Sequence, residues 1–231
     1  MKIGVALSGS GVGAAFAHVF ADELRACAVP IDMISVTSLT AVPIMLWSKG
    51  IPRAEIDQWM HEIQKNPEQG YKKLIQSDLL EKPCDYSLAV SSVDLSSGVT
   101  ILYTDRLQAD AWNLKALPLS GNEGQALLSS VSPYDGMEPL DMDKMKLCDF
   151  TVRYGCPFFP LKMAGIERIL SISFAGGNMP LQTAGDNMAA LTGRNADLHF
   201  TIEPESPKYA EAYIRSLVRN NLGMIYQKLL F

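Results

Sequence analysis

The segment that decides the fold reads IDMISVTSLTAVPIMLW over residues 31–47. Its first part, Asp32 to Val36, is a short apolar run of the kind that forms a buried parallel strand. Thr37 and Ser38 follow, and a helix-compatible apolar run begins directly after them without a linker. The segment therefore predicts a strand, a sharp turn at Thr37-Ser38 and a helix.

The residues before this segment predict the same kind of unit. Lys2 to Leu7 are mostly apolar, as in a buried parallel strand. Ser8 to Gly13 form a loop of small residues, and Ala14 to Cys27 continue as a helix with an apolar face. Pro30 separates that helix from the second strand. Right-handed crossovers join neighbouring parallel strands, so these two strands are expected to lie parallel.

The rest of the chain alternates between helical and strand-like patterns without an internal repeat or a clear linker. We therefore expect one α/β domain over residues 1–231, with a mainly parallel central sheet and helices on both faces. The predicted elements are a polar helical stretch from Arg53 to Lys82, strands at Tyr86–Asp94 and Val99–Thr104 joined by a hairpin turn at residues 95–98, a short helix at Gly124–Ser130, a loop through Pro133, Asp135, Gly136 and Pro139, strands at Met145–Asp149 and Arg168–Phe174, a loop at Ala175–Asn178, a strand at Leu198–Ile202, and a closing amphipathic helix from Pro207.

The composition of the chain indicates a globular protein and argues against some partners and locations. Hydrophobic residues make up 48% of the 231 residues and charged residues 19%, which is typical of a packed globular chain. The net charge of -5, without a run of Lys or Arg, argues against nucleic acid as a partner. Four scattered cysteines without a C-x-x-C pair favour free thiols in a reducing cytoplasm. Ser8 to Gly13 interrupt the apolar N-terminus, so we expect no export signal; contact with a membrane surface stays open.

Ser38 is the first residue expected to carry chemistry. Many hydrolases display a nucleophilic serine on a sharp strand-to-helix turn with the pattern G-x-S-x-G. Here the same frame reads Val36-Thr37-Ser38-Leu39-Thr40, so both glycines are replaced. The alternative interpretation is that Ser38 only caps the following helix.

The loop from Ser8 to Gly13 is the second such feature. Small residues let backbone N–H groups approach a ligand, so the loop can hold a phosphate or an oxyanion. It lacks the lysine of a Walker loop and fits the dinucleotide pattern only loosely. A nucleotide or phosphate site and a merely tight connection therefore both stay open.

Asp149, at the end of a predicted strand, is the third feature expected to carry chemistry. A carboxylate beside a serine can act as a general base if burial raises its pKa, whereas an isolated loop aspartate is usually solvated. A triad of Ser38 and His199 with Asp149 or Asp186 is a competing arrangement. The spacing of Asp141, Asp143 and Asp149 matches no metal loop, so we expect no metal site among them. We also expect no cofactor.

Taken together, these motifs resemble the patatin-like phospholipase family over nearly the whole chain. The resemblance lies in their order: Ala6–Ala14 for the glycine loop, Val29-Pro30-Ile31-Asp32 through Ser38 and Ala41 for the nucleophile segment, Ser91–Gly98 for an Asp-Leu turn, Ser129–Pro133 for an S-x-x-x-P segment, and Asp149-Phe150 followed by Cys156-Pro157 or Phe159-Pro160 for the catalytic acid.

The resemblance implies a serine acyl hydrolase with a Ser-Asp dyad and no histidine. Ser38 would be the nucleophile, Asp149 its base, and the backbone N–H groups of Gly9, Ser10 and Gly11 the oxyanion hole. The family cleaves acyl esters of phospholipids or other lipids through an acyl-enzyme, so the expected substrate is a lipid or small acyl ester.

The chain also departs from the family pattern around this site. Val36 and Thr40 replace the elbow glycines, and two β-branched residues there predict a widened or re-angled turn. Gly13 replaces a usual Arg or Lys, Ser10 replaces a glycine, and Phe150 places a ring after the acid. A misplacement of about 1 Å can lower a rate roughly a hundredfold. An impaired enzyme, or a non-catalytic patatin-like module that binds a lipid or protein partner, is therefore the alternative.

Overall fold

The structure is a computed structural model that describes residues 1–132, 138–177, 180–204 and 206–231. Four positions of the predicted loops, Pro133, Asp135, Gly136 and Asn178, lie outside the described residues. Within these ranges, no helix combines the length and the apolar character that crossing a membrane requires.

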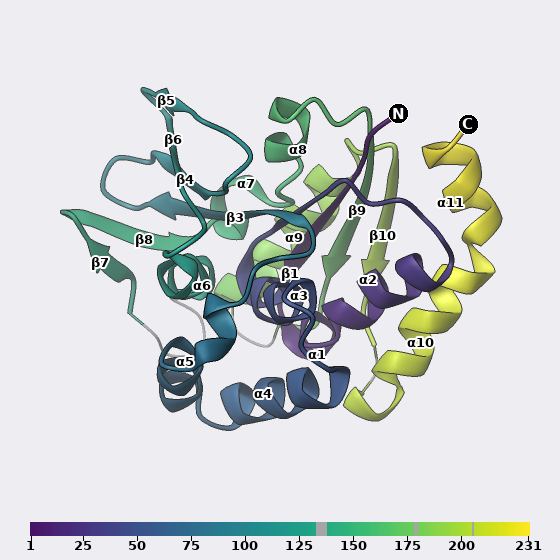
Figure 1. Cartoon of the computed structure of the whole chain (residues 1–231), viewed down its shortest axis with the longest axis horizontal. Coiled ribbons are helices and arrows are strands. Elements are labelled where there is room, and N and C mark those ends of the chain that lie inside the picture. The colour runs from purple at the N-terminus through teal and green to yellow at the C-terminus, as the bar shows by residue number, and fades with distance from the viewer. Residues whose placement is uncertain (133–137, 178–179, 205) are drawn as a thin grey trace.

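The described strands form one mixed, mostly parallel sheet in the order β10-β9-β1-β2-β3-β4-β6-β5, with β8 also paired to β3 and β7 paired to β8 (Figure 1). Strands β10, β9, β1, β2 and β3 run parallel, whereas β4 and β8 lie antiparallel to β3. The strands are β1 (Ile3–Gly9), β2 (Met33–Val36), β3 (Ser87–Asp94), β4 (Thr100–Tyr103), β5 (Asp110–Ala111), β6 (Leu114–Leu117), β7 (Leu140–Met142), β8 (Met145–Asp149), β9 (Arg168–Phe174) and β10 (Leu198–Ile202).

Helices cover both faces of this sheet, so the predicted α/β class is confirmed. One face carries α2, α3, α10 and α11 among others, and the opposite face carries α8 and α9. The helices are α1 (Gly11–Ala14), α2 (Ala17–Ala26), α3 (Ala41–Ser48), α4 (Arg53–Lys65), α5 (Pro67–Ile75), α6 (Glu123–Val131), α7 (Thr151–Tyr154), α8 (Phe159–Met163), α9 (Pro180–Gly193), α10 (Pro207–Asn220) and α11 (Leu222–Leu229), with 3-10 turns η1 (Ser38–Thr40) and η2 (Asp78–Glu81).

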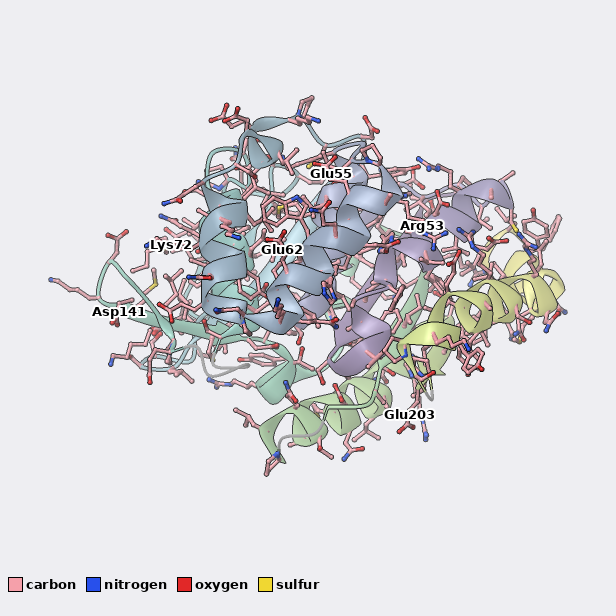
Figure 2. All side chains as sticks on the ribbon, turned by 90° about the horizontal axis from the view of Figure 1, so that it is seen from below. Arg53, Glu55, Glu62, Lys72, Asp141 and Glu203 are labelled. Carbon is pink, nitrogen blue, oxygen red and sulfur yellow. The ribbon has the colours of Figure 1, made fainter. Side chains whose placement is uncertain are left out.

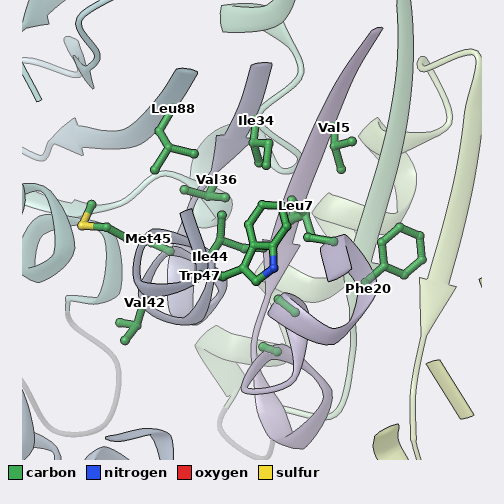
Figure 3. Close-up of a cluster of buried hydrophobic side chains, with 14 of the residues drawn as sticks. Val5, Leu7, Phe20, Ile34, Val36, Val42, Ile44, Met45, Trp47 and Leu88 are labelled. Atoms are coloured by element: carbon green, nitrogen blue, oxygen red, sulfur yellow. The ribbon is translucent and has the colours of Figure 1, made fainter. Parts of the chain in front are cut away.

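The alternation of side chains along β1 shows how the two layers are built. Val5 and Leu7 belong to the larger core with Phe20 of α2, whereas Ala6 packs with Leu161 of α8 on the other face. Figure 3 shows the larger cluster, in which side chains of β1 and β2 meet those of α2 and α3. Because successive side chains of a strand point to opposite faces, one apolar strand supplies both cores.

The predicted strand, turn and helix at residues 31–47 appear as β2, η1 and α3. The hairpin turn after β3 is also confirmed, because β3 and β4 pair antiparallel around it. The carboxylate of Asp94 holds this turn by accepting the backbone N–H groups of Ser96 and Ser97, each at 3.1 Å.

The stretch from Arg53 to Lys82, predicted as polar and helical, is divided into α4, α5 and η2. Asn66 ends α4 and caps α5, since its side-chain oxygen accepts the backbone N–H of Gln69 at 3.3 Å, and Pro67 occupies the first position of α5. The closing helix is likewise two helices, α10 and α11, which meet at Asn221. Strands β5 and β6 were not predicted, because they are short and partly exposed.

A buried ion cluster fastens α10 to α2. The Glu23 side chain is 1% exposed and accepts hydrogen bonds from Arg215 Nη1 and Arg219 Nε, each at 2.5 Å. Arg215 also bonds to Glu211, which pairs with Arg53 of α4. Two arginines therefore neutralise one buried carboxylate that joins distant parts of the chain.

Replacing Glu23 by Ala should lower the free energy of unfolding by about 1–3 kcal/mol, because two charge-assisted hydrogen bonds to a buried group are lost. The matched control is Glu62→Ala on the surface of α4 (Figure 2), where the carboxylate forms an exposed ion pair with Lys73 at 3.3 Å. That change should cost less than about 1 kcal/mol. Urea unfolding of both variants measures the difference, and equal losses would contradict a structural role for the Glu23 cluster.

Candidate active site

Ser38 sits at the turn between β2 and α3 with a backbone φ of +61°, in the left-handed region. Residues other than glycine rarely adopt this region, and such strain concentrates at functional sites. The same strained turn presents the serine of a nucleophile elbow. The Ser38 residue is only 2% exposed, so the turn holds its hydroxyl within the structure rather than in bulk solvent.

Side chains hold this turn without the glycines of the usual pattern. Val36 is fully buried at the end of β2, paired with Leu7 of β1 and Val90 of β3. The Thr40 hydroxyl lies 2.7 Å from the Thr37 carbonyl oxygen and 3.2 Å from the Leu7 carbonyl oxygen. Both β-branched side chains are therefore accommodated, and the Thr40 hydroxyl ties the turn to β1.

The glycine loop lies against the end of β9. Gly9 and Gly11 have φ values of +115° and +72°. A Cβ atom on Gly9 would lie 2.0 Å from the Phe174 carbonyl oxygen, and one on Gly11 would lie 2.6 Å from the Gly176 carbonyl carbon. Both positions therefore require glycine, because two backbone segments pass at contact distance.

Gly13, where the family usually carries Arg or Lys, is also closely packed. A Cβ atom there would lie 2.9 Å from Pro204 Cδ and 3.0 Å from Phe174 Cδ1. A basic side chain at this position would require Pro204 and Phe174 to move.

Asp186 of α9 connects the glycine loop to the loop after β9. Its Oδ1 accepts the backbone N–H of Ser10 at 3.1 Å, and its Oδ2 accepts the backbone N–H of Gly177 at 3.1 Å. The Ser10 hydroxyl lies 2.9 Å from both carboxylate oxygens. Burial raises the pKa of Asp186, while hydrogen bonds from Gly177 and Ser10 oppose the rise. The Ser10 N–H, predicted as an oxyanion donor, is thus engaged within the protein.

A pocket of about 190 Å³ opens between these elements. Its lining comprises residues 10–12, 38–39 and 176–177 together with Gln64, Val131 and Gln182. The structure therefore brings Ser38, Ser10 and Gly11 to one cavity. Gly9 is outside this lining and lies at the end of β1, paired with Phe174.

Asp149 ends β8 directly behind the turn and is fully buried. Its Oδ1 accepts the backbone N–H of Thr151 at 2.6 Å and lies 3.4 Å from the Thr37 hydroxyl. Burial raises the pKa of Asp149 to about 7. A carboxyl group in that range can exchange a proton near neutral pH.

The Ser38 hydroxyl is the strongest of the hydrogen-bonding groups that oppose this rise in the pKa of Asp149. The buried Oδ2 of Asp149 nevertheless makes no hydrogen bond of standard geometry to any described residue. The two side chains are thus near neighbours without a direct, well-aligned hydrogen bond. Catalytic hydrogen bonds are often long without substrate and shorten in its complex.

Phe150, which was expected to crowd the site, packs elsewhere. Its ring stacks on Tyr154 at 4.7 Å and on Phe159 at 5.6 Å between ring centroids. It does not belong to the lining of the Ser38 pocket.

The histidines do not join Ser38 in the described structure. His199 Nδ1 lies 2.7 Å from the Ser171 hydroxyl, and its Nε2 lies 3.2 Å from the Thr201 hydroxyl. Buried His18 lies 3.2 Å from Asp57, and His61 is exposed on α4. Asp186 bonds to Ser10 and Gly177, so the triad with His199 is not assembled. Among the described residues, no three His, Cys, Asp or Glu side chains gather closely enough to hold a metal ion.

Sequence reasoning missed the role of Asp186 and of the pocket residues Gln64, Val131 and Gln182. Asp186 was considered only as a partner of His199. The glycine pair Gly176-Gly177, separated from the predicted strand Arg168–Phe174 by Ala175 alone, is the signal that a second loop approaches the first.

The raised pKa of Asp149 predicts how stability depends on pH. The unfolded chain releases this proton near pH 4, whereas the folded chain keeps it up to about pH 7. The folded state binds more protons between these values, so its stability falls as the pH rises through this window. Asp149→Asn removes that loss and should be more stable than the native chain at pH 8, by an amount on the order of a few kcal/mol, and not at pH 4.

Urea unfolding between pH 4 and pH 8 measures this difference. Asp141→Asn, at an exposed position on β7 (Figure 2), removes the same charge and should leave the pH dependence unchanged. If Asp149→Asn follows the native pH dependence, the Asp149 carboxyl does not carry the raised pKa.

No protein-family model matches this chain, and no curated protein matches it in sequence. Among solved structures, the chain is similar to one from the heterodimeric complex ExoU–SpcU of the type III secretion system of Pseudomonas aeruginosa, with 12% identity and a TM-score of 0.43. The match covers all of this chain and 52% of that one, so the chain spans about half its length. At this TM-score the similarity supports no inference about function.

Proposed function

We propose that the chain is a patatin-like serine acyl hydrolase that cleaves lipid or small acyl esters, with Ser38 as nucleophile and Asp149 as base. One observation carries the proposal. A serine held at a φ of +61° lines a pocket with the glycine loop, and a buried carboxyl group with a pKa near 7 lies behind it. Acyl transfer needs a nucleophile, a base and donors for an oxyanion, and the strained serine, the neighbouring carboxyl group and the glycine loop would supply them.

In the first half of the reaction, Asp149 accepts the Ser38 hydroxyl proton as Oγ attacks the ester carbonyl carbon. The carbonyl oxygen becomes an oxyanion, and its collapse expels the alcohol, which takes the proton back from Asp149. In the second half a water molecule attacks the acyl-Ser38 ester, loses its proton to Asp149, and the acid leaves as Ser38 regains a proton. Asp149 needs a pKa near the working pH for both transfers.

For the oxyanion hole we propose backbone N–H groups that line the pocket. Gly11 lines it from the glycine loop, and Leu39 follows the nucleophile, the position that supplies one donor in hydrolases with an elbow. Ser10 and Gly9, the other two residues named from the sequence, would act by shaping the loop, because the Ser10 N–H donates to Asp186.

The other interpretations fit this site less well. A phosphate or nucleotide would need the N–H groups of the loop, but the Ser10 donor is already bonded to a carboxylate that repels anions. A non-catalytic module would not require a serine in a strained conformation beside a buried acid. Four free thiols suit a reducing compartment, so we propose a cytoplasmic location.

A fluorophosphonate probe should label the native chain at Ser38, and Ser38→Ala should abolish both labelling and hydrolysis of p-nitrophenyl butyrate. Loss of a nucleophile typically lowers kcat by roughly 10⁴-fold or more. Ser35→Ala on β2 is the control, because that buried hydroxyl has no hydrogen-bond partner among the described residues and lies outside the pocket. A folded native chain that neither reacts nor hydrolyses esters would favour a binding module.

The kcat/KM of the native chain should rise with pH and level off above an apparent pKa near 7, because Asp149 must be ionised to accept the Ser38 proton. Asp149→Asn should lower kcat at least about a hundredfold at every pH, since general bases typically contribute 10²–10⁴-fold. Steady-state rates between pH 5 and pH 9 provide the measurement. A rate that is flat across this range would show that another group acts as the base.

A further inference from the structure

The size of the Ser38 pocket limits what can enter it. Its volume of about 190 Å³ is that of a small pocket. Sites for drug-sized ligands span about 300–1,000 Å³. The cavity beside Ser38 can therefore enclose a short acyl group, whereas the rest of a long lipid chain would extend beyond its lining.

Apolar side chains form part of its wall. Val12 comes from the start of α1, Leu39 from the elbow, and Val131 from the last turn of α6. Val131 is 2% exposed and belongs to the main core, so it cannot swing aside without opening a cavity. Val131 thus fixes the position of one wall of the pocket.

The described lining of the pocket is also uncharged. None of the described residues that line it is charged, and the polar side chains beside Ser10 and Ser38 are the neutral amides Gln64 and Gln182. The N–H groups of Ser10 and Gly177 donate to Asp186, so they are not available to an incoming anion. A phosphate placed here would lose its hydration without gaining a cation.

These observations deepen the proposed function, on which the following inference rests. We propose that the Ser38 site selects short, uncharged acyl esters, of about four to six acyl carbons or fewer, and rejects long-chain and phosphate-bearing lipids. The apolar wall sets the chain length, and the uncharged lining with Asp186 behind it excludes the anion.

Rates of ester hydrolysis test the two parts of this inference, acyl-chain length and substrate charge, separately. Among p-nitrophenyl esters, kcat/KM should be highest for acetate or butyrate and at least tenfold lower for decanoate. Glyceryl tributyrate and dibutyryl phosphatidylglycerol carry the same acyl groups, without and with a phosphate. The neutral ester should be hydrolysed at least tenfold faster. A preference for decanoate, or equal rates on the phospholipid, would overturn the inference while leaving the hydrolase intact.

Val131→Ala tests whether the wall sets the length. Removing two methyl groups should move the preferred chain toward longer acyl groups by one or two carbons. Leu128→Ala, on the same helix but outside the lining, is the matched control and should keep the native profile. Circular dichroism confirms that both variants fold. An unchanged profile in folded Val131→Ala, or the same shift in both, contradicts the assigned role of this wall.

Binding distinguishes failure of this inference from failure of the proposed function. Backbone amide NMR on the full chain would follow Leu39 and Gly177 during titration with N-methylbutyramide, N-methyldecanamide or butyl phosphate, none of which requires turnover. Stronger shifts with N-methylbutyramide support the inference even if no ester is cleaved, in which case only the hydrolase proposal fails. Preference for butyl phosphate or the decanamide, or no shift with any probe, overturns the inference.

Discussion

The arrangement of the pocket depends on the hydrogen bonds that the Asp186 carboxylate accepts from two loops. This carboxylate reaches from α9 to the backbone of Ser10 and Gly177 and so joins the loops that follow β1 and β9. These loops touch so closely that neither Gly9 nor Gly11 has room for a Cβ atom. A backbone N–H that loses its buried partner destabilises the fold by about 1–3 kcal/mol. The carboxylate therefore keeps the loops in the spacing that the Ser38 pocket requires.

Asp149, the other buried carboxylate near the pocket, accepts fewer hydrogen bonds from the described residues than Asp186 does. Its Oδ1 accepts a short backbone hydrogen bond from Thr151 and lies near the Thr37 hydroxyl, whereas its Oδ2 has no partner among the described residues. Burial raises the pKa of Asp149 to about 7, and its hydrogen bonds oppose that rise only in part. Asp186, with both oxygens bonded, connects two loops, whereas Asp149 keeps one oxygen without a partner among the described residues, as the proposed proton transfer requires.

Local sequence patterns predicted the elements around Ser38 and Asp149, but they could not predict the long-range contacts between these elements. The strand, turn and helix around Ser38 are encoded within seventeen residues, so their order could be predicted, as could the position of Asp149 at a strand end. The contact of Ser10 with Asp186 spans 176 residues and leaves no trace in local periodicity. The sequence also could not show how Val36 and Thr40 are accommodated at the turn. The Thr40 hydroxyl bonds to the carbonyl oxygen of Leu7 on another strand, a contact that local patterns do not predict.

The position of β1 has a consequence for how the chain folds. Its neighbours in the sheet are β2, which follows closely, and β9, which begins only at Arg168. During synthesis β1 therefore keeps one edge unpaired until β9 has emerged. Sheets closed by such distant pairings form slowly and expose apolar edges meanwhile. The glycine loop contacts the end of β9, so the Ser38 pocket cannot be complete before β9 has joined the sheet.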